Sequence, residues 1–221
     1  MQSEIPATAP TDQADQITIS MASIPSRLQG MLTVIERLLP QCDQMIISLN
    51  DYPNVAHSLL EDPKVRVIHS PKEMGARGKF LMTANTPGYH IIVDDDILYP
   101  YDYVWTMISH VEYFKRQAIV GAHGKLFMYR KPPHPMTFIN YNFADKIASY
   151  YPVHMLGTGT IAYHSSLITI DARSLAPGKI DDQVALLCQK FCIPCLVVPH
   201  NAQWMQDLTD ISVLDALRRN I

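Results

Sequence analysis

Short apolar runs alternate with helical segments from residue 16 onward, and this alternation constrains the fold more than any other feature of the sequence. The runs that predict buried strands are residues 17–22, 45–50, 64–69, 89–94 and 117–123. The segments between them predict helices at residues 26–40, 52–61, 77–86 and 100–116. Strands joined through helices need crossover connections, which place neighbouring strands parallel. The sequence therefore predicts an α/β fold with a mainly parallel central sheet flanked by helices.

The second half of the chain is less regular. Residues 124–165 carry Pro, Tyr, Phe and Gly in short runs and predict a mixed region of strands and loops. The last predicted elements are a helix at 180–191, a strand at 195–199 and a short helix at 211–219. We expect a flexible tail over residues 1–15 and one domain over residues 16–221.

Composition excludes several classes of protein. The chain has 221 residues, 48% of them hydrophobic and 18% charged, so it can bury a full core and is not disordered as a whole. A formal net charge of -3 argues against nucleic acid as a partner. There is no apolar stretch of about 18 residues to span a membrane, and the first residues do not form a secretory signal. With four cysteines, we expect a reducing compartment and a cytoplasmic location, either free or peripheral at the membrane.

Three consecutive aspartates follow the apolar run at 89–93. Asp94, Asp95 and Asp96 would repel one another unless they were solvated or shared a divalent cation. Carboxylate oxygens suit Mg²⁺ or Mn²⁺, and open α/β sheets bind ligands outside the carboxyl ends of their strands. The alternative is a solvated turn that caps the next helix. We favour the metal site because the triplet comes directly after a buried strand.

Basic and amide side chains stand at the ends of other predicted strands. Arg27 follows the first strand, and Arg77 and Lys79 lie beside glycines at a predicted helix start, where cations and backbone N–H groups suit a phosphate. The alternative for all three is a solvated surface cation. Asn50 and Asp51 follow the second strand and could bind a nucleobase, or form an Asx turn instead.

Six segments carry a family resemblance when they are taken in chain order: ITISMASIPSR, IISLNDY, GARGKF, VDDDILYPYDYV, GTGT and IDDQ. Together they resemble GT-A-fold glycosyltransferases, especially family-two enzymes and capsule polymerases of the chondroitin-synthase type. The resemblance covers most of residues 16–205. It implies a nucleotide-binding part over 16–123 and an acceptor and catalytic part over 124–205. It also implies an inverting, metal-dependent transfer of a sugar from a nucleotide-sugar donor, a UDP-sugar by preference, to a glycan or glycolipid acceptor.

The resemblance assigns roles to the acidic triplet. It implies that Asp94 contacts the nucleoside of the donor and that Asp96 ligates Mn²⁺ or Mg²⁺ at the diphosphate. Asp95 could serve in either role. His200 follows the last predicted strand, where some relatives place a histidine that completes the metal shell. The alternative for His200 is a structural histidine.

The resemblance also assigns the acceptor side. It implies that a carboxylate at the start of helix 180–191 removes a proton from the acceptor, and we favour Asp182 with Asp181 second. Relatives often read Glu-Asp here, whereas this chain reads Asp-Asp, and both aspartates could simply cap the helix. Gly157, Thr158 and Gly159 are expected to shape the acceptor pocket, or to form a tight turn.

Other functions compete with this interpretation. A phosphatase of the haloacid-dehalogenase class also places Asp-x-Asp after a strand, but there the motif strand comes first. A non-catalytic domain of a larger synthase that binds a nucleotide sugar or a glycan is the second alternative. A nucleotidyltransferase has a related sheet, but it normally has a Gly-rich loop after the first strand, and SMASIPSR lacks glycine.

A zinc site is not favoured, although Cys188, Cys192, Cys195 and His200 have suggestive spacing. The cysteines lie in an apolar segment, where buried structural thiols explain them better.

Overall fold

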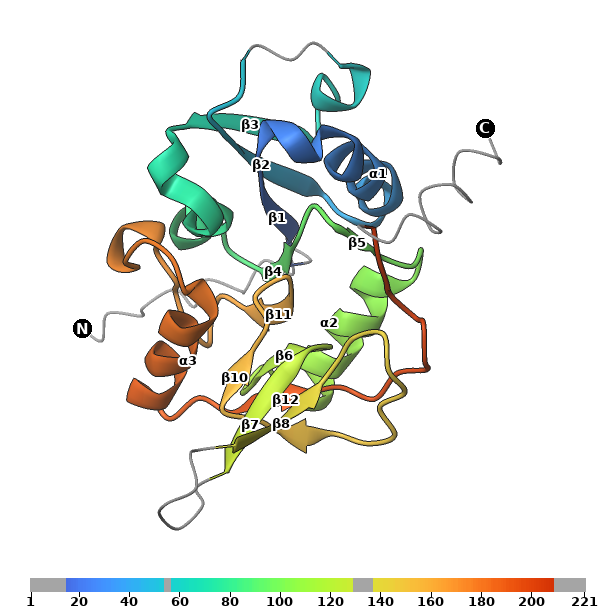
Figure 1. Ribbon diagram of the computed structural model, residues 1–221, viewed down its shortest axis with the longest axis vertical. Coiled ribbons are helices and arrows are strands. Elements are labelled where there is room, and N and C mark those ends of the chain that lie inside the picture. Colours follow the sequence, from blue (N-terminus) through green and yellow to red (C-terminus); the bar gives the residue numbers. More distant parts are fainter. Residues whose placement is uncertain (1–14, 54–56, 129–136, 209–221) are drawn as a thin grey trace, which may run out of the picture.

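A central sheet of eight strands organises the chain in the order β3-β2-β1-β4-β11-β6-β12-β9 (Figure 1). The structure is a computed structural model that describes residues 15–53, 57–128 and 137–208. In sheet order the strands are β3 (Val65–Ser70), β2 (Gln44–Asn50), β1 (Ile17–Ser23), β4 (Tyr89–Val93), β11 (Thr160–His164), β6 (Ile119–Gly121), β12 (Cys195–Val197) and β9 (Tyr151–Pro152).

Parallel pairing dominates the half of the sheet that the sequence predicts best. Strand β1 pairs in parallel with β2 and β4, and β2 pairs in parallel with β3. Strand β11 runs antiparallel to both β4 and β6, while β12 is parallel to β6. The predicted α/β fold class, with a mainly parallel sheet flanked by helices, is confirmed.

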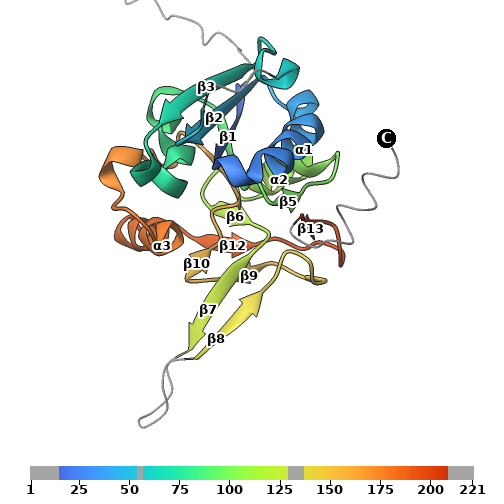
Figure 2. The same cartoon turned by 45° about the horizontal axis from the view of Figure 1, so that its top comes forward.

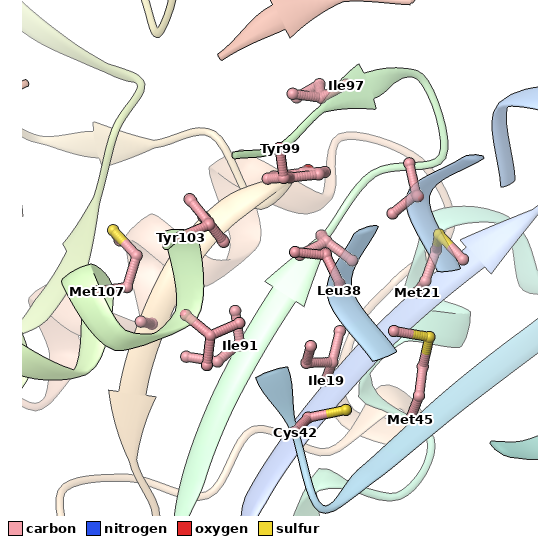
Figure 3. Close-up of a cluster of buried hydrophobic side chains, with 14 of the residues drawn as sticks. Ile19, Met21, Leu38, Cys42, Met45, Ile91, Ile97, Tyr99, Tyr103 and Met107 are labelled. Atoms are coloured by element: carbon pink, nitrogen blue, oxygen red, sulfur yellow. The ribbon is translucent and has the colours of Figure 1, made fainter. Parts of the chain in front are cut away.

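Helices cover both faces of this sheet. Helix α1 (Leu28–Leu38) and helix α2 (Tyr103–Tyr113) pack on one face, and α3 (Ile180–Lys190) packs on the other. An apolar core therefore lies on each face of the sheet, the first beneath α1 and α2 and the second beneath α3. Side chains of β4 alternate between them, because Ile91 and Val93 belong to the first core and Ile92 to the second. Figure 3 shows the first core, where apolar side chains of the sheet and both helices meet.

The 3-10 helices connect these elements. They are η1 (Pro25–Arg27), η2 (Leu39–Gln41), η3 (Ser58–Leu60), η4 (Lys72–Phe80), η5 (Thr83–Asn85) and η6 (Ala172–Ser174). The prediction of a helix at 77–86 is therefore wrong in type and place. Gly75 has φ 52, and Gly78 packs so closely on β2 that a Cβ would collide with Ser48. These two glycines favour a kinked 3-10 segment that lies against the sheet.

Part of the less regular second half forms a small antiparallel sheet that projects from the main body (Figure 2), while β9 and β11 join the central sheet. Its strands are β10 (Met155–Leu156), β7 (Gly124–Met128) and β8 (Thr137–Tyr141). A separate pair joins β5 (Ile97–Leu98) to β13 (Gln206–Asp207).

Some predicted elements are shorter than expected or fall outside the described residues. Of the helix predicted at 52–61, the described residues 52–53 and 57–61 contain η3, and the strand predicted at 117–123 shortens to β6. The helix predicted at 211–219 and nearly all of the expected tail at 1–15 lie outside the described residues. Within the described part of the chain, the helices are too short or too polar to cross a membrane.

Candidate functional site

The carboxyl ends of β1, β2 and β4 meet at one edge of the sheet, because these strands are parallel neighbours. A cavity of about 210 Å³ lies at this edge, and we name it the strand-end cavity. Its lining residues are Ala22, Ser23, Ile24, Arg27, Asn50, Gly75, Ala76, Lys79, Asp94 and Asp95. The edge therefore combines the cations, the amide and the carboxylates that the strand ends predicted.

Two cations pair with the acidic triplet inside this edge. Arg27 Nη1 lies 2.9 Å from Asp95 Oδ1 and 2.9 Å from Asp96 Oδ2. Lys79 Nζ pairs with Asp94 Oδ1. The side chains of Asp95 and Lys79 are only 3% and 4% exposed, whereas that of Arg27 is 45% exposed. Arg27 is thus the cation that most readily reaches a ligand in the cavity.

Burial and the charge of the salt-bridge partner shift the pKa values of Asp96 and Arg27 in opposite directions. Burial raises the pKa of Asp96, the charge of Asp94 adds to this, and Arg27 opposes it. Burial alone would lower the pKa of Arg27, but its hydrogen bond to Asp95 and the nearby carboxylate charges raise it overall. Three carboxylates here pair with two cations, Arg27 and Lys79, and such an excess of acidic groups attracts a further cation.

A second cavity of about 240 Å³ adjoins the first, and we name it the loop cavity. Its lining residues are Asp94, Asp96, Ile97, His123, Phe143, Gly157, Thr158, Gly159, Thr160, Asp181 and Asp207. Asp94 lines both cavities, so its carboxylate stands between them.

The first turn of α3 places one of its two aspartates in the loop cavity. Asp181 Oδ1 accepts hydrogen bonds from Thr158 N at 2.9 Å and from Thr158 Oγ1 at 2.6 Å. Asp182 is exposed and does not line either cavity. Successive residues of a helix point about 100° apart, so only one of two adjacent aspartates can face the same space.

Two glycines leave room for side chains that face the loop cavity. A Cβ on Gly159 would collide with the Asp94 carboxylate, and one on Gly157 would lie 2.9 Å from His123 Cδ2. Burial lowers the pKa of His123, with a further contribution from the charge of Lys125. His123 is therefore a neutral imidazole at neutral pH, and it faces the same space as Asp181.

Asn50 lines the strand-end cavity, but its amide is already engaged. It accepts a hydrogen bond from Ser48 Oγ at 3.1 Å and donates one to Gly75 O at 3.0 Å. Asp51 is exposed, has φ 57, and does not line either cavity. Asn50 thus fixes the Gly75 backbone that forms one wall of the cavity.

Two other predicted residues lie outside both cavities. Arg77 donates to the carbonyls of Glu73, Met74 and Leu175, which leaves it joining η4 to η6. His200 contacts the Ala122 carbonyl through Nε2 at 3.2 Å, and its ring stacks on Trp204 with centroids 5.7 Å apart. The structure does not bring His200 to the acidic triplet.

The described residues contain no group of three or more His, Cys, Asp or Glu side chains arranged to hold a metal ion. Asp94, Asp96 and Asp207 nevertheless line the same cavity. Mg²⁺ commonly takes only one or two protein carboxylates together with ligand phosphates. The carboxylates present therefore fit a cation that arrives with a phosphorylated ligand. The cysteines at 42, 188, 192 and 195 are free thiols.

Sequence reasoning missed three residues of the site. Tyr99, in the segment between β5 and α2, bonds the Gly159 carbonyl, and Thr160 at the start of β11 lines the loop cavity. Asp207 reaches the loop cavity through the β5–β13 pair. Asp207 lies more than a hundred residues from the triplet, so no local pattern could have placed it there. Tyr99 lies within the segment VDDDILYPYDYV, but nothing in that segment indicated a role for it.

Sequence comparison finds no relative of this chain, since no family model matches it and no curated protein is detectably similar. Solved structures do share its fold. The 4-diphosphocytidyl-2C-methyl-D-erythritol synthase of Anaerococcus prevotii DSM 20548 superposes with a TM-score of 0.59 at 10% identity, covering 95% of this chain and 100% of that one. A second structure of a synthase with the same name gives a TM-score of 0.52 at 13% identity over 94% of this chain and 98% of that one.

A third solved structure has the same character. The 2-C-methyl-D-erythritol 4-phosphate cytidylyltransferase of Thermus thermophilus gives a TM-score of 0.51 at 11% identity, over 94% of this chain and 100% of that one. At such identities the similarity establishes the fold. That fold extends over almost the whole of this chain and of each compared chain.

These findings overturn the glycosyltransferase prediction. The similar structures are a cytidylyltransferase and two diphosphocytidyl-methylerythritol synthases, so the predicted family-two resemblance, the inverting sugar transfer and the glycan or glycolipid acceptor are wrong. The two alternatives, a phosphatase and a non-catalytic binding domain, gain no support either. The physical reason is that carboxylates after a central parallel strand indicate the edge of the sheet where ligands bind in such folds. They do not indicate which chemical group is transferred there.

Proposed function

We propose that the chain is a nucleotidyltransferase, which transfers a nucleotidyl group from a nucleoside triphosphate to a phosphorylated small molecule and releases pyrophosphate. One observation carries this proposal. Arg27 and Lys79 stand beside the acidic triplet at the carboxyl edge of β1, β2 and β4, in a fold shared with a cytidylyltransferase. Cations beside carboxylates at such an edge suit a polyphosphate that arrives with a divalent cation.

The strand-end cavity would hold the nucleoside triphosphate. Arg27 is half-exposed and can present its guanidinium fork to phosphate oxygens, because a charged ligand would compete with its carboxylate partners. Lys79 is buried and would act as a fixed positive charge below the phosphates. Positive charge here would stabilise the negative charge that develops on the departing pyrophosphate.

The glycine that lines the strand-end cavity comes from η4 and not from the loop after β1. In a nucleotidyltransferase, glycines in the loop after the first strand usually allow the backbone to approach the phosphates. The loop after β1 in this chain has no glycine. Gly75 of η4 lines the strand-end cavity instead and has φ 52, a conformation that glycine adopts at low cost. Asn50 holds its carbonyl at 3.0 Å. We infer that η4 supplies the close backbone approach in this chain.

The loop cavity would hold the acceptor. Four carboxylates line it, namely Asp94, Asp96, Asp181 and Asp207. A bare phosphate would be repelled there, whereas hydroxyl groups can donate hydrogen bonds to carboxylates. We infer that the acceptor is a phosphorylated polyol whose hydroxyls face Asp181 and His123. Its phosphate would point toward the cations of the strand-end cavity.

A divalent cation is part of this proposal. Asp94 and Asp96 are the residues that would hold Mg²⁺ or Mn²⁺, since both carboxylates line the loop cavity and Asp94 also faces the strand-end cavity. When bound, such an ion neutralises charge on the phosphates.

The test is pyrophosphate release from the four ribonucleoside triphosphates. Each is mixed with 2-C-methyl-D-erythritol 4-phosphate or with a panel of sugar and polyol phosphates, in the presence of Mg²⁺ or Mn²⁺. We expect release that needs both substrates. Arg27→Ala should lower kcat/KM by about 10- to 100-fold, because a charge-assisted contact to phosphate is worth about 1.5–3 kcal/mol.

Arg173→Ala is the matched control. The Arg173 side chain is 82% exposed and pairs locally with Asp171, and neither residue lines the strand-end or the loop cavity. The proposal fails if the purified chain releases no pyrophosphate with any pair of substrates. Turnover of a nucleoside diphosphate sugar without pyrophosphate release would also contradict it.

A further inference from the structure

Tyr99 links the end of β4 to the loop that precedes β11. Its side chain is fully buried, and its hydroxyl accepts a hydrogen bond from Asp94 N at 2.8 Å. The same hydroxyl donates to Gly159 O at 2.5 Å. Burial raises the pKa of Tyr99, so the hydroxyl remains protonated and able to donate. One phenol therefore joins two backbone segments that lie far apart in the chain.

This link acts on the residue that separates the two cavities. Asp94 lines both of them, and a Cβ on Gly159 would collide with its carboxylate. Lys79 also pairs with this carboxylate. The position of the Asp94 carboxylate therefore depends on how closely the Gly159 backbone approaches it, and the Tyr99 hydroxyl sets that approach.

The neighbouring Tyr103 is a buried tyrosine that does not form such a link. It is also fully buried, and its ring centroid lies 4.7 Å from that of Tyr99. Its hydroxyl has no hydrogen-bond partner among the described residues. The two tyrosines thus share burial and aromatic packing and differ in the bonds of one oxygen atom.

We propose that Tyr99 is a positioning residue that holds the Asp94 carboxylate between the nucleotide and acceptor cavities. The inference rests on the proposed function for the identity of the ligands. The link itself does not depend on the proposed function, because the two hydrogen bonds of the Tyr99 hydroxyl are present in the folded chain whatever ligand it binds. Loss of the hydroxyl leaves both backbone groups unpaired. The Asp94 amide and the Gly159 carbonyl, which lie one residue beyond the Val93–Thr160 pair of the β4–β11 ladder, can then move apart.

The experiment compares Tyr99→Phe with Tyr103→Phe in the full chain. Amide hydrogen exchange is followed in peptides that cover residues 93–99 and 156–160, and Mn²⁺-dependent binding of each ribonucleoside triphosphate is measured by titration. We expect faster exchange in both peptides for Tyr99→Phe only. We also expect Tyr99→Phe to bind the nucleotide about 10- to 100-fold more weakly than Tyr103→Phe, since a small misplacement of an active-site group costs about that much.

Each outcome decides the inference. Exchange and binding in Tyr99→Phe that match Tyr103→Phe would overturn it. If the wild-type chain binds and converts no nucleotide, the proposed function fails, while the exchange data alone still decide whether Tyr99 holds the two segments together. If Tyr99→Phe does not fold, Gly159→Ala tests the same position, because its methyl group must displace the Asp94 carboxylate. Nucleotide binding by Gly159→Ala equal to that of the wild type would then overturn the inference.

Discussion

Removal of Arg27 is expected to destabilise the fold by an amount that the burial of its partners determines. Arg27 Nη1 contacts Asp95, which is 3% exposed, and Asp96, which is 26% exposed. Loss of one partner of a buried ion pair costs about 3–5 kcal/mol, whereas an exposed pair contributes about 0–1 kcal/mol. Because Arg27 itself is 45% exposed and screened by water, we expect about 1–3 kcal/mol for Arg27→Ala.

Urea denaturation measures this cost. With a slope of about 2 kcal/mol per molar urea, the midpoint for Arg27→Ala should fall by about 0.5–1.5 M with the slope unchanged. Arg173→Ala is the control, since the chain offers there a second Arg–Asp contact, at 2.8 Å, whose arginine is 82% exposed. Its midpoint should stay where it is in the wild type.

The stability deficit of Arg27→Ala should also depend on pH, and the pKa of Asp96 determines the direction of that dependence. Burial raises the pKa of Asp96 above its ordinary value of 3.8, and Arg27 opposes that rise. Without Arg27 this pKa rises further, so the folded variant holds a proton that the unfolded chain releases. The stability of the variant relative to the wild type then falls as pH rises from the folded pKa of Asp96 in the wild type to its higher folded pKa in the variant, and this contribution to the deficit is absent below that range. A deficit equal to that of Arg173→Ala, or one independent of pH, would refute this reasoning.

Three further predictions concern the acceptor side, a buried histidine and the cation. Asp181→Asn should lower kcat/KM by about 10- to 100-fold and Asp182→Asn should change it far less, because only Asp181 lines the loop cavity; equal losses in a steady-state assay would contradict this. Burial lowers the pKa of His90 to about 4, so the folded state keeps it neutral. Stability should therefore be lost as pH falls from 6.5 to about 4, by about 3 kcal/mol for this group, and less steeply in His90→Gln; identical pH profiles in thermal melts would argue against it. Chelation of divalent cations should abolish pyrophosphate release and added Mg²⁺ or Mn²⁺ should restore it, whereas full activity in chelator would remove the cation from the account.

The sequence predicted the sheet and the edge at which polar side chains gather, because both depend on local patterns. Uninterrupted apolar runs identify strands that are buried on both faces, and side chains just beyond parallel strands must meet at one edge. Arg27, Asn50 and the aspartates at 94–96 were found in this way. They lie together around the strand-end cavity and the adjoining loop cavity.

The remaining features depend on long-range contacts that no local pattern encodes. Arg77 was expected at a phosphate, but the Leu175 carbonyl, 98 residues away in the chain, takes one of its donors. The choice between Asp181 and Asp182 depends on the rotation of α3 about its axis, which the packing of the helix sets. Tyr99 has a role only because β11 brings Gly159 beside β4.

The group that is transferred could not be predicted from the acidic triplet. Carboxylates at this edge can hold a cation and a nucleotide in enzymes that break quite different bonds. The chemistry depends on which phosphate or sugar atom faces the acceptor, and in the proposed function the side chains of the loop cavity would determine that orientation.

The most direct test of nucleotidyl transfer follows a radioactive phosphate through the reaction. The wild-type chain is incubated with a phosphorylated polyol, Mg²⁺ and a nucleoside triphosphate labelled at either the α- or the γ-phosphate. We predict that α-label appears in a new conjugate with the acceptor and that γ-label appears in pyrophosphate. Transfer of γ-label to the acceptor, or no transfer of either label with any nucleotide, would contradict it.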